Sequence, residues 1–179
     1  MTERRPIAEV LATERLTLHR PVEADIAAIL RIHRDPRTCV HNPSDGLRTI
    51  EQATRLFHRW NDQWSRFGIG YLTAREHGCA TVLGFCGVKA MLLKDRPILN
   101  LFYRLDPAAW GHGYASEAAR SVVGWAGRRL PGPPIVARVR PRNTASQRVA
   151  TKAGLTRAPD LDGPGSDGID WIYVSEWPE

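Results

Sequence analysis

Long apolar runs are absent from this sequence, and no stretch approaches the ~20 consecutive apolar residues that a membrane-spanning helix needs. Its first residues, MTERRPIAEVLATERL, lack the apolar core of a secretory signal. Cysteine is scarce: Cys39, Cys79 and Cys86 are the only three, and no CxxC pair occurs. These absences exclude a disulfide framework and predict a cytoplasmic protein with reduced thiols and no membrane partner.

Lysine is also scarce, since Lys89, Lys94 and Lys152 are the only lysines among 25 basic residues. The others are arginines, and the formal net charge is +6. Nucleic acid, a phosphorylated cofactor or an acidic protein surface would each suit this charge. The base composition of the source genome would explain the arginine usage equally well, so charge alone identifies no partner.

Several common functional motifs are missing. A P-loop needs a Gly-Lys pair, and the sequence contains none. The dinucleotide fingerprint G-x-G-x-x-G/A fails because Ser116 stands at its last position. No pair among the six histidines has metal-ligand spacing, and no G-x-S-x-G elbow occurs. The sequence therefore predicts no nucleotide hydrolase, NAD enzyme, serine hydrolase or metal site.

The hydrophobic periodicity predicts a mixed sheet covered by helices, in one domain of 179 residues. Thr49 and Gln52 have the spacing of a capping box and open a long helix. Leu56, Trp60 and Trp64 give that helix an aromatic stripe suited to core packing. Strands are predicted at 13–20, 70–75, 81–91, 98–105, 135–139, 155–158 and 169–175. Helices are predicted at 23–33, 49–67, about 114–130 and 144–153. The segment 160–168 is predicted to be a mobile loop.

A glycine-containing turn lies between the strand 98–105 and the helix that begins near Tyr114. Gly111 and Gly113 let the backbone turn sharply and expose successive N–H groups. The helix adds its unpaired N-terminal amides and the positive end of its dipole. This arrangement predicts a site for a phosphate or pyrophosphate, although two glycines also suit an ordinary strand-to-helix turn.

Two blocks resemble the GNAT superfamily of N-acetyltransferases. The stretch LFYRLDPAAWGHGYASEAARSVV resembles its coenzyme-A-binding motif, in the W-G-x-G-Y-A-x-E-A form of the branch of RimJ/RimL-type ribosomal-protein N-terminal acetyltransferases. The block 143–155 resembles that branch's N-x-x-S-x-x-x-x-x-K-x-G-[FL] segment. The resemblance covers roughly residues 13–174. It implies an α/β fold (an α+β mixed sheet), with a central, mostly antiparallel twisted sheet of six to seven strands and about four helices. One acetyltransferase domain would span 1–179, with 1–12 as a flexible N-terminal extension.

The resemblance also implies an acetyl-coenzyme A site. The strand that pairs with the pantetheine arm would carry Phe102, Tyr103, Arg104 and Leu105. The amides around the pyrophosphate would come from Trp110, Gly111, His112, Gly113, Tyr114, Ala115 and Ser116. Asn143 would hydrogen-bond the pantetheine, and Ser146, near the sulfur, would act as the general acid toward the departing thiolate.

The reaction implied is direct transfer of the acetyl group to a primary amine, with no covalent enzyme intermediate and no metal. The acceptor would be a protein N-terminus or a small amine. Three positions depart from the family's pattern: Ala108 replaces a Gln or Arg, Phe102 a Gly, and Asn100 the Glu that helps to deprotonate the amine. Cofactor binding should survive these changes, but the general base becomes unknown.

Replacement bases are His41, His112, Asp170 and a relay through bulk water. A cationic acceptor would prefer an acidic pocket, which Asp160, Asp162, Asp167 and Asp170 would provide unless they form a solvated turn.

Two other functions stay open at this point. A non-catalytic acyl-coenzyme A sensor would bind the cofactor without turnover. An arginine-rich RNA- or ribosome-binding protein is disfavoured because no stretch combines aromatic and basic residues, so no nucleic acid partner is expected. The acyl-chain preference stays open, and the oligomeric state is a monomer or a homodimer.

Overall fold

The structure is a computed structural model that describes residues 11–177. Nine strands occur there: Leu11–Ala12 (β1), Leu16–His19 (β2), Tyr71–Glu76 (β3), Gly84–Leu93 (β4), Arg96–Leu105 (β5), Ile135–Val139 (β6), Thr156–Arg157 (β7), Gly163–Gly165 (β8) and Gly168–Val174 (β9). The α-helices of this part of the chain are Ile26–Arg34 (α1), Pro36–Cys39 (α2), Ile50–Phe67 (α3), Tyr114–Arg129 (α4) and Thr144–Lys152 (α5).

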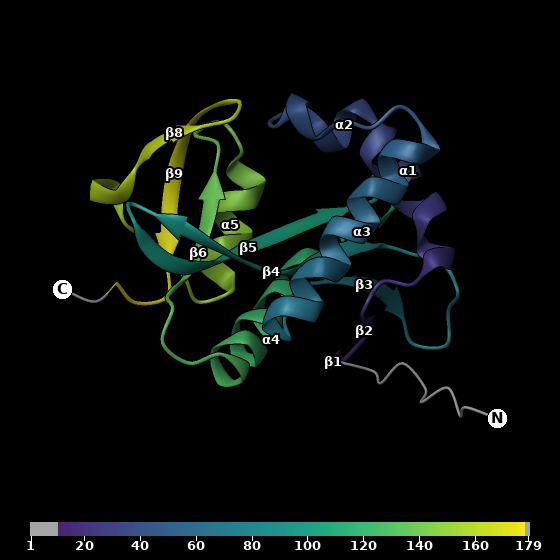
Figure 1. The fold of residues 1–179 in the computed structure, drawn as a ribbon, viewed down its shortest axis with the longest axis horizontal. Helices are drawn as coiled ribbons and strands as arrows, with labels where there is room; N and C mark the ends of the chain where they lie inside the picture. The colour runs from purple at the N-terminus through teal and green to yellow at the C-terminus, as the bar shows by residue number, and fades with distance from the viewer. Residues whose placement is uncertain (1–10, 178–179) are drawn as a thin grey trace.

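The strands form one open sheet in the order β1-β2-β3-β4-β5-β6-β9-β7, with β8 paired to β9 (Figure 1). Each neighbouring pair is antiparallel except β5 and β6, which run parallel. This confirms the predicted mixed, mostly antiparallel sheet. The elements beyond the predicted number are β1, β8 and α2. They are short, and two to four residues are too few to give a readable hydrophobic period.

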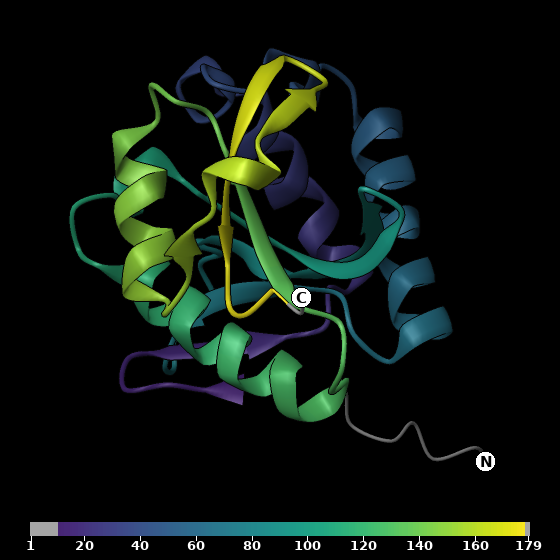
Figure 2. The ribbon, with the colours of Figure 1, turned by 90° about the vertical axis from the view of Figure 1, so that its left-hand side faces the viewer.

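Helices cover both faces of the sheet (Figures 1 and 2). On one face, α4 and α5 bury small and β-branched side chains such as Ala119, Val122 and Ala150 against β2 to β6. On the other face, α1 and α3 pack around Phe85 of β4. A smaller cluster lies between the β4–β5 hairpin, β6 and β9. None of the helices in the described residues is both long enough and apolar enough to span a membrane.

The predicted capping box is present at the start of α3. Thr49 Oγ1 accepts from the Gln52 N–H at 3.3 Å, and Gln52 Oε1 accepts from the Thr49 N–H at 3.1 Å. Gly68 ends the helix in the left-handed conformation, at φ 65°. The aromatic stripe faces the sheet: Trp60 is buried, and the Trp64 indole donates to Tyr71 O at 2.9 Å. The stripe therefore packs in the core, as predicted, and Leu56 and Trp60 also line the cavity described below.

Two expectations need correction. The segment 160–168 is not a mobile loop throughout, because 163–165 form β8 and pair with β9 across the two-residue turn Ser166-Asp167. The flexible extension expected over residues 1–12 falls mainly on 1–10, which lie outside the described residues. Leu11 and Ala12 are ordered by pairing with Leu18 and Thr17.

Candidate active site

The edges of β5 and β6 separate partway along their length. Their parallel pairing covers only 99–101 of β5 and 135–137 of β6. On its other edge, β5 is paired with β4 along its entire length, while β6 continues alongside β9. The backbone of 102–105 therefore has no neighbouring strand on its β6 side, and polar backbone groups at such an edge are available to a ligand. This places the four residues predicted for the pantetheine strand along an open edge.

The glycine turn lies next to this open edge. Gly111 and Gly113 have φ angles of 81° and 79°, in the left-handed region that favours glycine. The first intrahelical bond of α4 runs from the Glu117 N–H to Gly113 O. The N–H groups of 114–116 precede it and have no partner within the helix, as at any helix N-terminus. Tyr114, Ala115 and Ser116 line the same cavity as the open edge of β5.

Arg15, a residue that the sequence analysis missed, stabilises the glycine turn. Its Nη1 donates to His112 O at 2.9 Å, and its Nε donates to Glu117 Oε2 at 2.7 Å. Glu117 also accepts from Thr13 Oγ1, so the β1–β2 turn holds the start of α4. These contacts join residues about a hundred positions apart in the chain, and no local pattern signals them.

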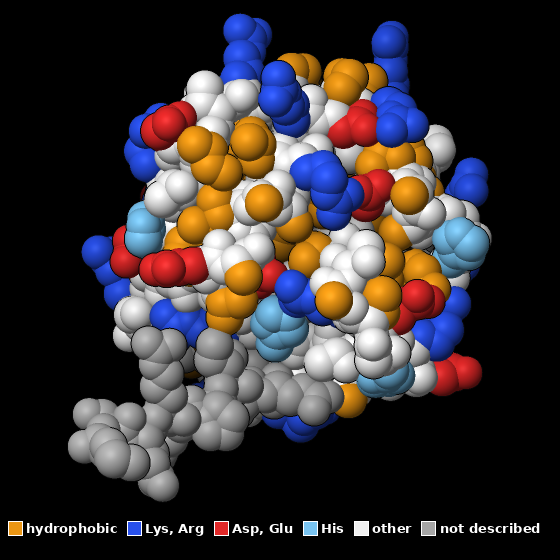
Figure 3. Space-filling view, turned by 90° about the vertical axis from the view of Figure 1, so that its right-hand side faces the viewer, with side chains coloured by type: hydrophobic (Ala, Val, Ile, Leu, Met, Phe, Trp, Pro, Cys, Tyr) orange, Lys and Arg blue, Asp and Glu red, His pale blue; other side chains and the backbone are white. Residues whose placement is uncertain are grey.

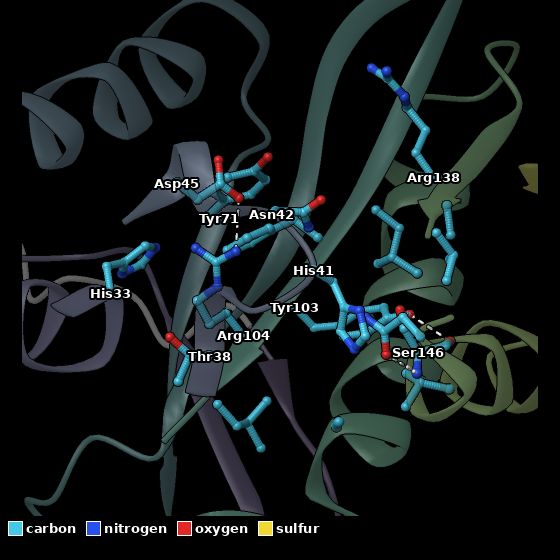
Figure 4. Close-up of a pocket in the computed structure, with 18 of the residues that line it drawn as sticks. His33, Thr38, His41, Asn42, Asp45, Tyr71, Tyr103, Arg104, Arg138 and Ser146 are labelled. Atoms are coloured by element: carbon cyan, nitrogen blue, oxygen red, sulfur yellow. Dashed lines mark hydrogen bonds and ion pairs between the residues drawn. The ribbon is translucent and has the colours of Figure 1, made fainter. Parts of the chain in front are cut away.

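The open edge and the turn form two walls of a cavity of about 1170 Å³ (Figure 4). Further walls come from α3, the segment 41–46 after α2, and the β8–β9 hairpin. The last two touch one another, since Ser44 Oγ donates to Asp167 Oδ2 at 2.6 Å. Arg140, which follows β6, bonds to both: its Nε donates to Asn42 Oδ1 at 3.0 Å and its Nη1 donates to Gly168 O at 2.5 Å. Segments from both halves of the chain therefore enclose the cavity.

Two hydroxyl groups meet in this cavity. Tyr103 Oη lies 2.6 Å from Ser146 Oγ and donates to Ser146 O at 2.8 Å (Figure 4). Asn143 caps α5 and accepts from the Ser146 N–H at 3.1 Å, which fixes Ser146 in the first turn of the helix. Burial raises the pKa of Tyr103, so its phenol stays protonated at neutral pH. The structure thus brings three of the predicted site residues together.

The candidate bases lie in different surroundings. Asp170 is buried, and its carboxylate is engaged by Arg138 at 2.6 Å and by Arg140 at 2.8 Å. His112 is exposed and does not line the cavity, whereas His41 does (Figure 4). Of the three, His41 alone is both in the cavity and outside an ion pair.

The acidic pocket considered as an alternative to a solvated turn does not form. Asp162 is paired with Arg157, Asp167 bonds to Ser44, and Asp170 is paired with two arginines. Asp160 and Asp162 do not line the cavity.

His33, another residue that the sequence analysis missed, lines the cavity from α1 (Figure 4). Burial, with a smaller effect of the nearby Arg104 guanidinium, lowers the pKa of His33 to about 3. Its Nδ1 lies 2.9 Å from Ile29 O, so in the neutral ring Nδ1 carries the proton. The imidazole is therefore uncharged at neutral pH and is a weak base.

The lowered pKa of His33 predicts that the protein loses stability in mild acid. Because its pKa is lower in the folded chain than the ordinary 6.5, the unfolded chain takes up a proton that the folded chain excludes. The stability that neutral His33 contributes is fully present above its ordinary pKa. It is lost as the pH falls toward the pKa of His33 in the folded chain. Between about pH 7.5 and about pH 5 we expect His33 to lower the free energy of unfolding by about 2 kcal/mol, measured by urea denaturation. His33→Phe should flatten that dependence, and an equally steep slope in the variant would contradict the assignment.

Comparison with known proteins identifies relatives of this chain. Residues 15–156 match the family model described as "Acetyltransferase (GNAT) domain". The chain is similar to an uncharacterized N-acetyltransferase, p20, of Bacillus licheniformis, with 29% identity over 159 residues that cover 83% of this chain and 86% of the relative. A crystal structure of an acetyltransferase from Agrobacterium tumefaciens is 29% identical, covers 99% of both chains and has a TM-score of 0.80. RimL, a ribosomal L7/L12 α-N-protein acetyltransferase solved with coenzyme A, is 15% identical, with a TM-score of 0.75 over 93% of this chain and 97% of its own.

Proposed function

The chain belongs to the GNAT acetyltransferase family, and from this premise we propose that it transfers the acetyl group of acetyl-coenzyme A to a primary amine. One observation carries the proposal: the open edge of β5 lies beside the unpaired amides of α4, in one cavity. The pantetheine arm pairs with the backbone of 102–105 as an added strand would. The pyrophosphate binds the amides of 110–116 and the positive end of the α4 dipole.

In this mechanism the protein supplies orientation and proton transfer. The neutral amine attacks the thioester carbonyl from the side of the cavity lined by α3 and by 41–46. Backbone N–H groups around 103–105 stabilise the negative charge that develops on the carbonyl oxygen. Ser146, in contact with Tyr103, donates a proton to the leaving thiolate. His41 or water removes the proton from the amine.

The acceptor is a protein N-terminus or a small amine. The W-G-x-G-Y-A-x-E-A block supports a place in the RimJ/RimL-type branch, as does the fold shared with RimL. We propose a single acetyltransferase domain over 1–179 and, because the three cysteines are unpaired, a cytoplasmic location. The enzyme acts as a monomer or homodimer, without a membrane or nucleic acid partner.

Thermal unfolding with acetyl-coenzyme A tests the cofactor, and release of free thiol with a panel of amines tests the reaction. At about 100 times its Kd, the cofactor should stabilise the fold by about 2.7 kcal/mol. Stabilisation with turnover on any amine supports the enzyme. Stabilisation with no turnover on peptides, polyamines or amino acids would instead support the acyl-coenzyme A sensor.

An RNA-binding role predicts a different result: no stabilisation by the cofactor and RNA affinity that falls steeply with salt. On the face shown in Figure 3, Lys and Arg side chains are scattered among acidic and apolar ones and do not form a continuous stripe. That surface offers little support for this alternative.

A further inference from the structure

The Arg104 guanidinium is buried in the cavity with part of its hydrogen-bonding capacity unused. Its side chain is 6% exposed. Nη2 donates to Asp45 Oδ2 at 2.8 Å, whereas Nη1 is buried and has no partner among the described residues (Figure 4). An unpaired N–H on a buried charged group is costly. Such a group in a cavity wall indicates a ligand atom that accepts a hydrogen bond.

A second buried atom without a partner lies on the same face of β5. Alternate residues of a strand point to one side, so Asn100, Phe102 and Arg104 share that side. Asn100 Oδ1 is buried and has no partner in the described part of the chain. Between the two polar residues, Phe102 stacks on Tyr71 at 4.6 Å, and the Arg104 guanidinium lies 5.4 Å from the Phe102 ring centre. The cavity thus presents one free acceptor and one free cationic donor beside a common aromatic surface.

The lining of the cavity carries a net positive charge. Seven Arg and Lys side chains and four carboxylates line it, and four of the seven cations are themselves ion-paired. Three of the lining carboxylates are already engaged: Asp45 with Arg104, Asp167 with Ser44, and Asp170 with two arginines. The fourth, Asp62, is exposed on α3. A polyamine would find few free carboxylates here.

We propose that the acceptor is an amino acid or a similar amino-carboxylate, whose carboxylate binds Arg104 Nη1 while its amine lies beside Asn100 Oδ1. This inference rests on the proposed acetyl transfer and specifies its acceptor. Arg104 then contributes through two separate parts: its backbone to the pantetheine strand and its guanidinium to the acceptor. The carboxylate fixes the amine in place, so the side chain of Arg104 is a specificity-determining group and takes no part in proton transfer.

The test compares matched acceptors on the wild-type protein. Free amino acids and ω-amino acids are each assayed beside their methyl esters, with spermidine and an N-terminal peptide amide as further acceptors. We expect the KM of a free acid to be about 10- to 100-fold below that of its ester, in line with one hydrogen bond to a charged group. Equal use of acids and esters, or a preference for spermidine or the peptide amide, would overturn the inference.

Arg104→Gln supplies the matched variant. Asp45 is half-exposed, so water can solvate it when its partner is removed. The variant should raise the KM of the free acid about 10- to 100-fold and leave that of the ester unchanged. Arg55→Gln, which removes an exposed charge from α3 outside the cavity, should change neither. Equal effects of Arg104→Gln on acid and ester would contradict the assignment, and if this variant fails to fold, the wild-type comparison still decides.

The two proposals fail in distinguishable ways. The proposed function would be refuted if acetyl-coenzyme A did not stabilise the protein and no amine gave thiol release. Stabilisation and thiol release with amines, but without a preference for carboxylates, would remove only the amino-carboxylate inference.

Discussion

Gly113→Glu is expected to abolish the stabilisation that acetyl-coenzyme A gives to the wild-type protein, with Kd raised by about 10³-fold or more. Gly113 precedes α4 at a φ of 79°, which costs a side-chain-bearing residue about 1–3 kcal/mol. The larger effect is electrostatic, because the new carboxylate lies at the amides proposed to hold the pyrophosphate. Like charges brought together at an interface cost several kcal/mol. Isothermal titration with coenzyme A measures the change in Kd directly.

A control substitution at another glycine separates the effect on coenzyme A binding from the effect of backbone strain. Gly78 has a φ of 71°, lies in the β3–β4 turn outside the cavity, and has open space around its Cβ position. Gly78→Glu therefore adds the same charge and a similar strain, and should leave the Kd unchanged. Coenzyme A affinity retained in Gly113→Glu would show that the pyrophosphate binds elsewhere.

Ser146→Ala should lower kcat by about 10²- to 10³-fold while changing the Kd for acetyl-coenzyme A little. Protonation stabilises the thiolate as it leaves, and Ser146 Oγ is held at the open edge by the Asn143 cap. The Tyr103 phenol donates to Ser146 O, so the Ser146 hydroxyl can in turn donate to Tyr103 or to a ligand. Single-turnover assays isolate the chemical step from product release.

Two further variants test whether the loss of kcat is specific to the Ser146 hydroxyl. Tyr103→Phe removes a contact of Ser146 while the serine hydroxyl remains, so we expect a smaller loss of about 10-fold. Thr151→Ala removes an exposed hydroxyl from the same helix and should have no effect. Wild-type kcat in Ser146→Ala would assign the proton to Tyr103 or to solvent.

The elements that were predicted correctly are those specified by local sequence. Gln52 lies three residues after Thr49, and this spacing alone defines the start of α3. The glycines at 111 and 113 adopt the left-handed backbone that few other residues tolerate. β8 was missed because Gly163-Pro164-Gly165 has no strand propensity, and only pairing with β9 makes it a strand.

The features of the site that were missed depend on contacts between distant segments. Arg15 meets the glycine turn, and Asp45 meets Arg104, only after the sheet has formed. The acidic pocket considered as an alternative to a solvated turn does not form, for the same reason: the sequence shows that Asp170 is acidic, but not that two arginines neutralise it. Partner choice between charged groups is a property of the fold, and charge along the chain does not determine it.

The position of β9 in the sheet has a consequence for the biogenesis of the protein. β9 is the C-terminal strand of the described residues, yet it lies between β6 and β7. Domains form from the N-terminal side during synthesis, so β6 remains an edge strand until 168–174 have emerged. Edge strands pair readily with other chains. A chain interrupted before Gly168 would therefore leave β6 as an unpaired edge, and we expect it to aggregate more readily than the full chain.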